Sequence, residues 1–393
     1  MVVLPLGAIL DWTMGTPAGS AAFRDRRINA MLKKILSVWC GFLSSCESRY
    51  VLNDSPSGWK GEAARRAIGI EQYKHDPDDE YWGFTSWNDF FTRRLADGAR
   101  PVDSPDDDSV IVSACESTPY GLAVDVQRQD QFWIKSQPYS LQDMLANDES
   151  AGQFVGGTVY QAFLSATDYH RWHSPVAGTI VRAFVQEGTY YSEADSEGAD
   201  AVEPQNSQSY LAHVAARAVF LIEADNPVVG LTAFVPVGMN EVSSCVIGQK
   251  IQPGCHVAKG EELGYFQFGG STHCLVFRPG AIADFSLTAI RNRTVRTPWY
   301  QSAPSSPPRR QGDPADEPCR SSQVSGRRRR APGPRCGPGG FPARPTAGPP
   351  ARAARLAARC QAGCRARRRH GGSASRRPCL PRRAGASPSL RGR

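Results

Sequence analysis

The stretch Leu263-Gly264-Tyr265-Phe266-Gln267-Phe268-Gly269-Gly270-Ser271-Thr272-His273 is an apolar, strand-like run that leads into a Gly-Gly-Ser-Thr sequence. Gly270 has no side chain, so its carbonyl carbon is open to approach and its backbone dihedrals are unrestricted. The hydroxyl of Ser271 can attack that carbonyl and convert the amide to an ester. Removal of the Ser271 α-proton then eliminates the ester and leaves dehydroalanine, which hydrolyses to a pyruvoyl group. Because most such strings are turns, this interpretation needs support from other residues.

Two histidines three residues apart stand in Tyr169-His170-Arg171-Trp172-His173-Ser174-Pro175-Val176-Ala177-Gly178, just before a Ser-Pro turn. Histidine is the usual proton shuttle near neutral pH, which makes His170 and His173 candidates for acid–base work. A pair of structural histidines is the simpler alternative. A zinc site is a further alternative, but zinc takes three or four ligands and no finger-like Cys/His spacing accompanies the pair, so no metal is predicted.

A carboxylate, Glu116, stands near the end of the short run Val112-Ser113-Ala114-Cys115-Glu116-Ser117. A carboxylate that orients an imidazole, which in turn activates a hydroxyl, is the general arrangement of a catalytic triad. Glu116 is therefore a candidate partner for one of the histidines and Ser271.

Together these segments resemble the phosphatidylserine decarboxylase family of pyruvoyl enzymes, in consistent order over residues 5–290. The segments that carry the resemblance are Trp87-Asn88-Asp89-Phe90-Phe91-Thr92-Arg93, Arg100-Pro101-Val102, Asp168-Tyr169-His170-Arg171-Trp172-His173-Ser174-Pro175 and Gly269-Gly270-Ser271-Thr272. The chain is more similar to the soluble fungal branch that includes L-tryptophan decarboxylases. That likeness lies in Leu6-Gly7-Ala8-Ile9-Leu10-Asp11-Trp12, Thr16-Pro17-Ala18-Gly19, Ile222-Glu223-Ala224-Asp225-Asn226 and Gly269-Gly270-Ser271-Thr272-His273-Cys274.

The resemblance implies a role for each candidate residue. The chain would cut itself between Gly270 and Ser271, and Ser271 would become the pyruvoyl group, with no pyridoxal phosphate and no metal. His173 would be the base in self-processing, Glu116 its orienting partner, and His170 would act later, in protonation or positioning of the substrate. Two departures stand out: Gly269 replaces the usual Leu of the cleavage motif, and Glu116-Ser117 replaces the usual Asp-Gly.

The body of the chain predicts an α+β fold. Apolar residues at helical spacing predict an amphipathic helix over residues 24–47, and Thr85 or Ser86 is the expected N-cap of a second helix that runs to Leu95. Short β-branched or aromatic runs bounded by turn residues predict strands over residues 109–114, 132–135, 158–165, 179–186, 214–223, 230–238, 242–249 and 263–268. By resemblance, an N-terminal helical region (1–107) packs on a mainly antiparallel β-sandwich core (108–290) of phosphatidylserine decarboxylase type.

Charge divides the chain into two unlike parts. Residues 291–393 hold 25 Arg, no Lys and three acidic residues, a net charge of +22, which leaves −14 on the rest of a chain whose total is +8. The tail is rich in Arg, Pro, Gly, Ala and Ser, so it cannot bury enough apolar surface to order itself, and we expect it to be disordered. A nucleic-acid-binding arm is one interpretation, but we favour translation of GC-rich DNA in a wrong frame and do not expect a nucleic-acid partner.

These observations favour a self-processing pyruvoyl-dependent decarboxylase that releases CO2 from a free aromatic L-amino acid such as tryptophan. The alternative substrate is phosphatidylserine, with the helix at 24–47 as a peripheral membrane contact; an inactive relative is a third interpretation. We expect the cleaved chains to stay associated in a homo-oligomer. No apolar run is long enough to span a membrane and residues 2–10 make a poor signal peptide, so we expect a soluble cytoplasmic protein.

Overall fold

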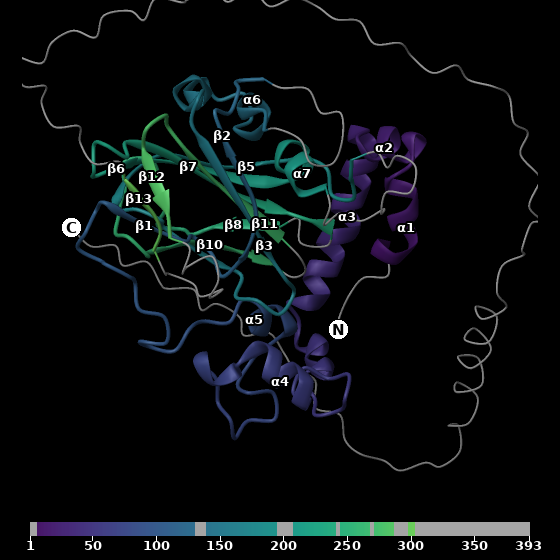
Figure 1. Cartoon of the computed structure of the whole chain (residues 1–393). Coiled ribbons are helices and arrows are strands. Elements are labelled where there is room, and N and C mark those ends of the chain that lie inside the picture. The colour runs from purple at the N-terminus through teal and green to yellow at the C-terminus, as the bar shows by residue number, and fades with distance from the viewer. Residues whose placement is uncertain are drawn as a thin grey trace, which may run out of the picture. The chain divides into compact units, whose positions relative to one another are not determined.

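The structure is a computed structural model that describes residues 6–129, 139–194, 207–240, 244–267, 271–286 and 298–302. All of these residues lie in one compact unit, Met1–Asp313. Gly269 and Gly270, the predicted strand at 132–135 and the tail beyond residue 302 lie outside the described residues. In Figure 1 the strands gather in the centre, with α1 to α3 beside them.

The N-terminal part of the chain is helical, as predicted. The helix expected over 24–47 is confirmed as α3 (Arg26–Leu43), which begins at the N-cap Asp25 because the Asp25 carboxylate accepts hydrogen bonds from the amides of Arg27 and Ile28. The other helical segments are α1 (Leu6–Met14), α2 (Pro17–Phe23), η1 (Cys46–Val51), α4 (Glu62–Ile68), η2 (Ile70–Gln72) and α5 (Trp87–Phe91).

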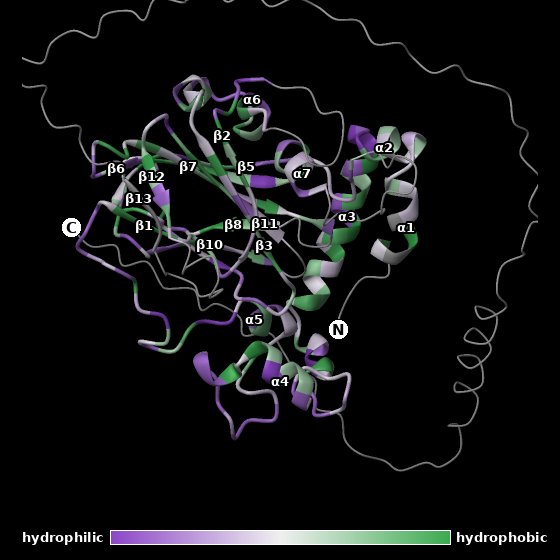
Figure 2. Cartoon of the chain, viewed as in Figure 1, coloured by the Kyte–Doolittle hydropathy of each residue, from purple (hydrophilic) through white to green (hydrophobic). Residues whose placement is uncertain are grey.

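The apolar residues of α3 lie on two faces (Figure 2). Leu32, Leu36 and Leu43 are buried, whereas a second set spaced at three or four residues is exposed: Ile28, Met31, Ile35 and Val38. No helix in the part of the chain that the structure describes is long and apolar enough to cross a membrane.

Helix α5 has the predicted cap but is shorter than expected. The Ser86 side chain accepts a hydrogen bond from the Asp89 amide, and the helix ends at Phe91 rather than at Leu95. The reason is that Leu95 pairs with Tyr73 in an antiparallel bridge, which draws the chain after Phe91 into an extended conformation. The aromatic side chains of α5 are buried in a cluster with other tryptophans and phenylalanines: Trp59, Trp82, Phe84, Trp87, Phe90 and Phe91. Each large apolar side chain buried in this way contributes about 1.5–3 kcal/mol to stability.

Three antiparallel sheets form the rest of the fold that the structure describes. The largest has seven strands in the order β2-β3-β11-β7-β6-β5-β9, and the smaller ones have the orders β4-β10-β8 and β1-β13-β12. The strands are β1 (Val110–Val112), β2 (Thr118–Val124), β3 (Thr158–Leu164), β4 (Arg171–His173), β5 (Gly178–Gln186), β6 (Arg217–Ala224), β7 (Leu231–Gly238), β8 (Ser244–Ile247), β9 (His256–Val257), β10 (Glu262–Gln267), β11 (Ser271–Phe277), β12 (Ile282–Phe285) and β13 (Pro298–Ser302). Three short helical segments complete the fold: α6 (Leu141–Met144), η3 (Glu149–Phe154) and α7 (Gln208–Val214).

The strand predictions differ from the structure at several places. The strand expected over 214–223 begins only at Arg217, because the preceding residues form α7. Strand β11 was not predicted, since Gly-Gly-Ser-Thr resembles a turn, yet it is a central strand that starts at Ser271 itself. Strand β13 lies beyond the boundary predicted at residue 290.

Apolar clusters cover both faces of the large sheet. Alternation along β11 sends Leu275 into one cluster and Cys274 and Val276 into the other. The first cluster joins the large sheet to the β4-β10-β8 sheet through Trp172 of β4, whose ring lies 4.9 Å from Phe266, 5.9 Å from Phe220 and 6.2 Å from Phe234. The α+β fold with sheets packed face to face is therefore confirmed.

Candidate active site

Ser271 is the first residue of β11 and lies in the middle of the large sheet. It pairs with Leu164 of β3 on one side and with Gly238 of β7 on the other. The residue has 0% exposure, and its Oγ has no hydrogen-bond partner among the described residues. A buried hydroxyl without a hydrogen-bond partner contributes no stability, so the hydroxyl of Ser271 is available for chemistry as far as the described residues are concerned.

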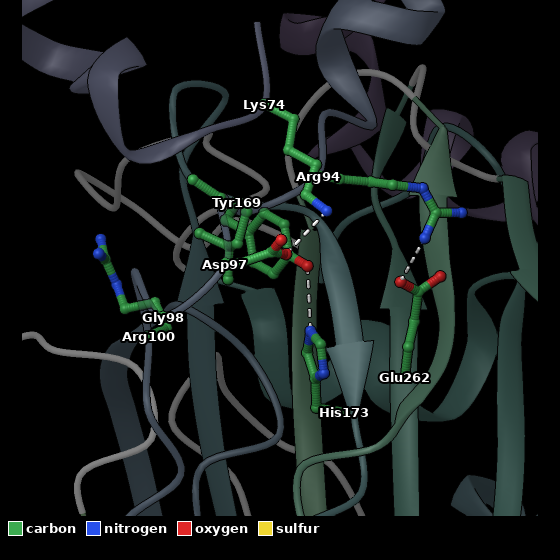
Figure 3. Close-up of a pocket in the computed structure, with 10 residues that line it drawn as sticks. Lys74, Arg94, Asp97, Gly98, Arg100, Tyr169, His173 and Glu262 are labelled. Carbon is green, nitrogen blue, oxygen red and sulfur yellow. Dashed lines mark hydrogen bonds and ion pairs between the residues drawn. The ribbon is translucent and has the colours of Figure 1, made fainter.

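His173, at the end of β4, is buried with a partner at each ring nitrogen. Its Nδ1 lies 2.8 Å from the carbonyl oxygen of Gly260, and its Nε2 lies 3.1 Å from the hydroxyl of Tyr169 (Figure 3). Because a carbonyl only accepts, Nδ1 carries the hydrogen and donates it. The neutral ring then accepts at Nε2 from the Tyr169 hydroxyl, and the two rings also stack at 5.7 Å. The basic nitrogen of His173 is therefore Nε2.

Glu116 lies close to His173 in the fold but has different direct partners. The His173 amide donates to the carbonyl of Ala114, two residues before Glu116, at 2.9 Å. The Glu116 carboxylate accepts from Nε of Arg100 at 3.0 Å and from the hydroxyl of Tyr73 at 3.3 Å. Burial is the main cause that raises the pKa of Tyr73, and the charge of Glu116 raises it further. The charge of Arg93 acts in the opposite direction.

Two tyrosines extend between the carboxylate and the imidazole. The rings of Tyr73 and Tyr169 lie 6.0 Å apart, with the Tyr73 hydroxyl on Glu116 and the Tyr169 hydroxyl on His173. The orienting contact from Glu116 to His173 stays a prediction. In the structure, the partners of the His173 ring are the Gly260 carbonyl and the Tyr169 hydroxyl. Tyr169 stands directly before His170 in the segment that carried the resemblance, so its position was a usable signal. No sequence signal pointed to Gly260, because its contact with His173 is made by the backbone carbonyl, which every residue has.

His170 is fully buried between two aromatic side chains. Its Nδ1 lies 2.9 Å from the carbonyl oxygen of Asp168, its ring stacks on Phe91 of α5 at 4.2 Å, and Phe266 of β10 meets it edge-on at 6.4 Å. The Phe266 amide donates to the His170 carbonyl at 2.9 Å. The contact with Phe91 shows that the N-terminal helical region helps to build the environment of this histidine.

A cavity of about 260 Å³ opens beside His173. Arg100 and Tyr169 share its wall with His173, and two ion pairs lie at its rim: Lys74 with Asp97 at 2.8 Å, and Arg94 with Glu262 at 3.3 Å (Figure 3). The remaining lining residues are Leu95, Ala96 and Gly98. The cavity thus brings a candidate base together with three cationic side chains, each of which is paired with a carboxylate: Lys74, Arg94 and Arg100.

His273 is a buried histidine that the sequence interpretation did not place in the site. It follows Ser271 by two residues in β11, so both side chains project to the same face of the sheet. Its Nε2 lies 3.1 Å from the hydroxyl of Ser117, the residue after Glu116. Burial lowers the pKa of His273 to about 3, so the ring is neutral near pH 7. If β11 had been predicted, the alternation of side chains along a strand would have placed His273 on the same face as Ser271.

Acid should destabilise the fold through two buried histidines. Burial lowers the pKa of His273 to about 3, and burial together with Arg217 lowers the pKa of His213 to about 4. Below about pH 6.5 both histidines become protonated in the unfolded chain, whereas they are still neutral in the folded chain. Stability is therefore complete above this pH and falls as the pH drops, by up to about 1.4 kcal/mol per pH unit for each histidine. Urea unfolding of the uncut Ser271→Ala chain at pH 7 and pH 5 measures this loss; equal stability at both values would contradict it.

Comparison with known proteins agrees with this arrangement. Two family models described as phosphatidylserine decarboxylase match residues 87–296 and 1–68. Decarboxylase iboD of Amanita muscaria is 41% identical over 313 residues, which cover 75% of this chain and 89% of that protein. L-tryptophan decarboxylase of Psilocybe cubensis is 38% identical over 308 residues, or 71% of this chain and 69% of that protein. Phosphatidylserine decarboxylase proenzyme 3 of Schizosaccharomyces pombe is 34% identical over 214 residues, or 54% of this chain and 21% of that protein.

The family is pyruvoyl-dependent in general and acts on small molecules. The buried serine at the head of β11, the buried side chains of His170 and His173 and the match along both the helical and the β-rich parts agree with one another. This chain belongs to the phosphatidylserine decarboxylase family and is a decarboxylase, that is, a carboxy-lyase.

Proposed function

We propose that this chain is a precursor that cuts itself between Gly270 and Ser271 and then decarboxylates a free aromatic L-amino acid such as L-tryptophan. The observation that carries the first part is the buried Oγ of Ser271 at the start of β11, which has no hydrogen-bond partner among the described residues. Support for the substrate comes from the similarity to the L-tryptophan decarboxylase of Psilocybe cubensis, which extends over 71% of this chain.

In the cutting step, Ser271 Oγ attacks the Gly270 carbonyl carbon, the C–N bond breaks and an ester forms. His173 Nε2 is the group that accepts the hydroxyl proton, and the Gly260 carbonyl stabilises the resulting imidazolium at Nδ1. A base then removes the Ser271 α-proton, and elimination releases the Gly270 carboxylate. One water molecule is consumed as the dehydroalanine becomes pyruvoyl and ammonia leaves.

The surroundings of Ser271 fit a pyruvoyl group. The position is buried and flanked by strands on both sides, and no residue that the structure describes forms a hydrogen bond with the hydroxyl. A pyruvoyl group supplies an electrophilic carbonyl that draws electrons from the bond to the departing CO2. His170 is the residue that we propose to deliver a proton to the product carbon, because histidine is the usual proton donor near neutral pH and the Asp168 carbonyl fixes the ring through Nδ1.

A substrate panel tests the second part of the proposal. Purified, cut protein is incubated with L-tryptophan, L-phenylalanine, L-tyrosine, L-leucine and phosphatidylserine vesicles, and CO2 release is measured. We expect turnover of an aromatic amino acid, with at least about tenfold preference over L-leucine from apolar contacts with the ring. Preferential turnover of phosphatidylserine would overturn the substrate assignment without affecting the self-cutting.

Phosphatidylserine remains the second candidate because of the exposed apolar face of α3. Ile28, Met31, Ile35 and Val38 are exposed there, and Arg27 and Lys34 are exposed on the same helix. Such a face fits the surface of an anionic membrane or a second copy of the chain. We propose a homo-oligomer whose cut chains stay together. Liposome flotation and size-exclusion chromatography with light scattering separate these outcomes, since strong flotation favours the phospholipid.

A further inference from the structure

The turn of residues 258–261 carries the carbonyl that holds His173. Gly260 has a φ of +79°, and a Cβ at this position would lie 2.4 Å from Cγ2 of Val102, so the site requires glycine. The Gly260 amide donates to the carbonyl of Ser174 at 2.8 Å, while its own carbonyl accepts from His173 at 2.8 Å. The position of this turn therefore sets the position of the imidazole.

Lys259, the neighbour of that glycine, is a buried lysine with 6% exposure. Its Nζ donates to the carbonyl of Ser104 at 2.8 Å and to the carbonyl of Asp107 at 2.6 Å. Burial lowers the pKa of Lys259, and a group of nearby aspartates opposes that shift: Asp103, Asp106, Asp107 and Asp108. A buried ammonium costs free energy that an apolar side chain of the same length would not, so its presence indicates that the cross-link has a use.

The cross-link joins a turn that contacts His173 to a loop that precedes a second contact of the same histidine in the chain. Residues 258–261 provide the Gly260 carbonyl. The loop of residues 103–107 leads into β1 and then to Ala114, whose carbonyl accepts from the His173 amide at 2.9 Å. A shift of either segment relative to the other would move a partner of the same histidine.

We propose that Lys259 is a positioning residue for His173: by tying the turn of residues 258–261 to the loop of residues 103–107, it keeps the Gly260 carbonyl on Nδ1 and leaves Nε2 as the basic nitrogen. This inference rests on the proposed self-cutting at Ser271. If the turn moves away, the imidazole gains access to the other tautomer, in which Nε2 carries the hydrogen and cannot accept a proton.

The first test follows self-cutting in full-length chains made by cell-free synthesis, with electrophoresis at timed intervals. Lys259→Met should slow the cut by about tenfold or more, the size typical of a lost outer-shell contact. Lys259→Arg should restore most of the rate because it keeps a charged donor. The matched control is Lys60→Met, since the Lys60 side chain is only 11% exposed and its Nζ also donates to a carbonyl, that of Glu80 at 2.7 Å. This control should cut at the wild-type rate.

The second test reads the tautomer of His173 directly and does not depend on cutting; the Ser271→Ala chain alone decides the tautomer, and Lys259→Arg replaces Lys259→Met in the first test if the latter does not fold. Ring nitrogen chemical shifts of His173 in the uncut Ser271→Ala chain should report the Nδ1–H tautomer, and Lys259→Met in the same background should report a mixture. A wild-type chain that does not cut would overturn the proposed function. The ring nitrogen chemical shifts of His173 would still decide whether Lys259 positions that histidine. Equal cutting rates for Lys259→Met and wild type, an Nε2–H tautomer in the Ser271→Ala chain, or equal slowing by Lys60→Met would overturn the inference alone.

Discussion

Replacing Ser271 with alanine is expected to leave a single uncut chain and to lower decarboxylation by about 10⁴-fold or more, because both the nucleophile and the source of the pyruvoyl group are removed. The wild-type protein should yield two chains with a break between Gly270 and Ser271. The new N-terminus of the smaller chain should be blocked, and its mass about 17 Da below that of the same chain beginning with serine, since ammonia is lost. Intact mass and denaturing electrophoresis measure both results.

The Ser271→Ala chain should also fold normally, because the hydroxyl that it loses has no hydrogen-bond partner among the described residues. Its unfolding temperature should equal or exceed that of the uncut wild-type precursor. The control is Ser20→Ala, a substitution of another buried serine, which lies in α2 and should leave cutting intact. A cut Ser271→Ala chain would contradict the assignment of the nucleophile.

Substitution of the two neighbouring histidines should separate self-cutting from decarboxylation. His173→Gln should remain uncut, because Gln cannot accept the proton that His173 Nε2 takes from Ser271. His170→Gln should cut, but its decarboxylation rate should fall by about 10²–10⁴-fold, the range for loss of a general acid or base. Electrophoresis and CO2 release from L-tryptophan, measured on the same preparations, give the two readouts.

His256→Gln is the matched control for this pair. His256 is exposed and pairs with Asp225 at 2.8 Å, so its replacement should leave both steps unchanged. A His170→Gln chain that stays uncut would assign that histidine to self-processing instead. A His173→Gln chain that cuts at the wild-type rate would exclude His173 as the base.

The sequence predicted those parts of the fold whose causes are local. The apolar spacing over residues 24–47 predicted α3, Ser86 was one of two predicted caps of α5, and the apolar run before residue 268 forms β10. Strand β4 was missed because three residues containing Arg171 and His173 show no strand pattern of their own. That segment is a strand because it pairs with β10, which is a long-range contact.

The candidate site also contains features that the sequence predicted and features that it did not. The side chains of Ser271, His170 and His173 are visible in the sequence because their chemistry is unusual. The groups that hold them are not: the Gly260 carbonyl and the Asp168 carbonyl belong to the backbone, and the bond from Arg100 to Glu116 spans 16 residues. Such contacts depend on how separate segments pack, and composition or spacing does not contain them.

The position of β11 between β3 and β7 has a consequence for how the mature enzyme denatures. With the proposed cut before Ser271, the smaller polypeptide would be hydrogen-bonded to the larger one along both edges of this strand. Heating or urea would then release two molecules, and recovery would require them to meet again and to insert a strand into the middle of a sheet. Loss of the mature enzyme should accordingly be irreversible and governed by its unfolding rate, whereas the uncut precursor refolds as a single polypeptide.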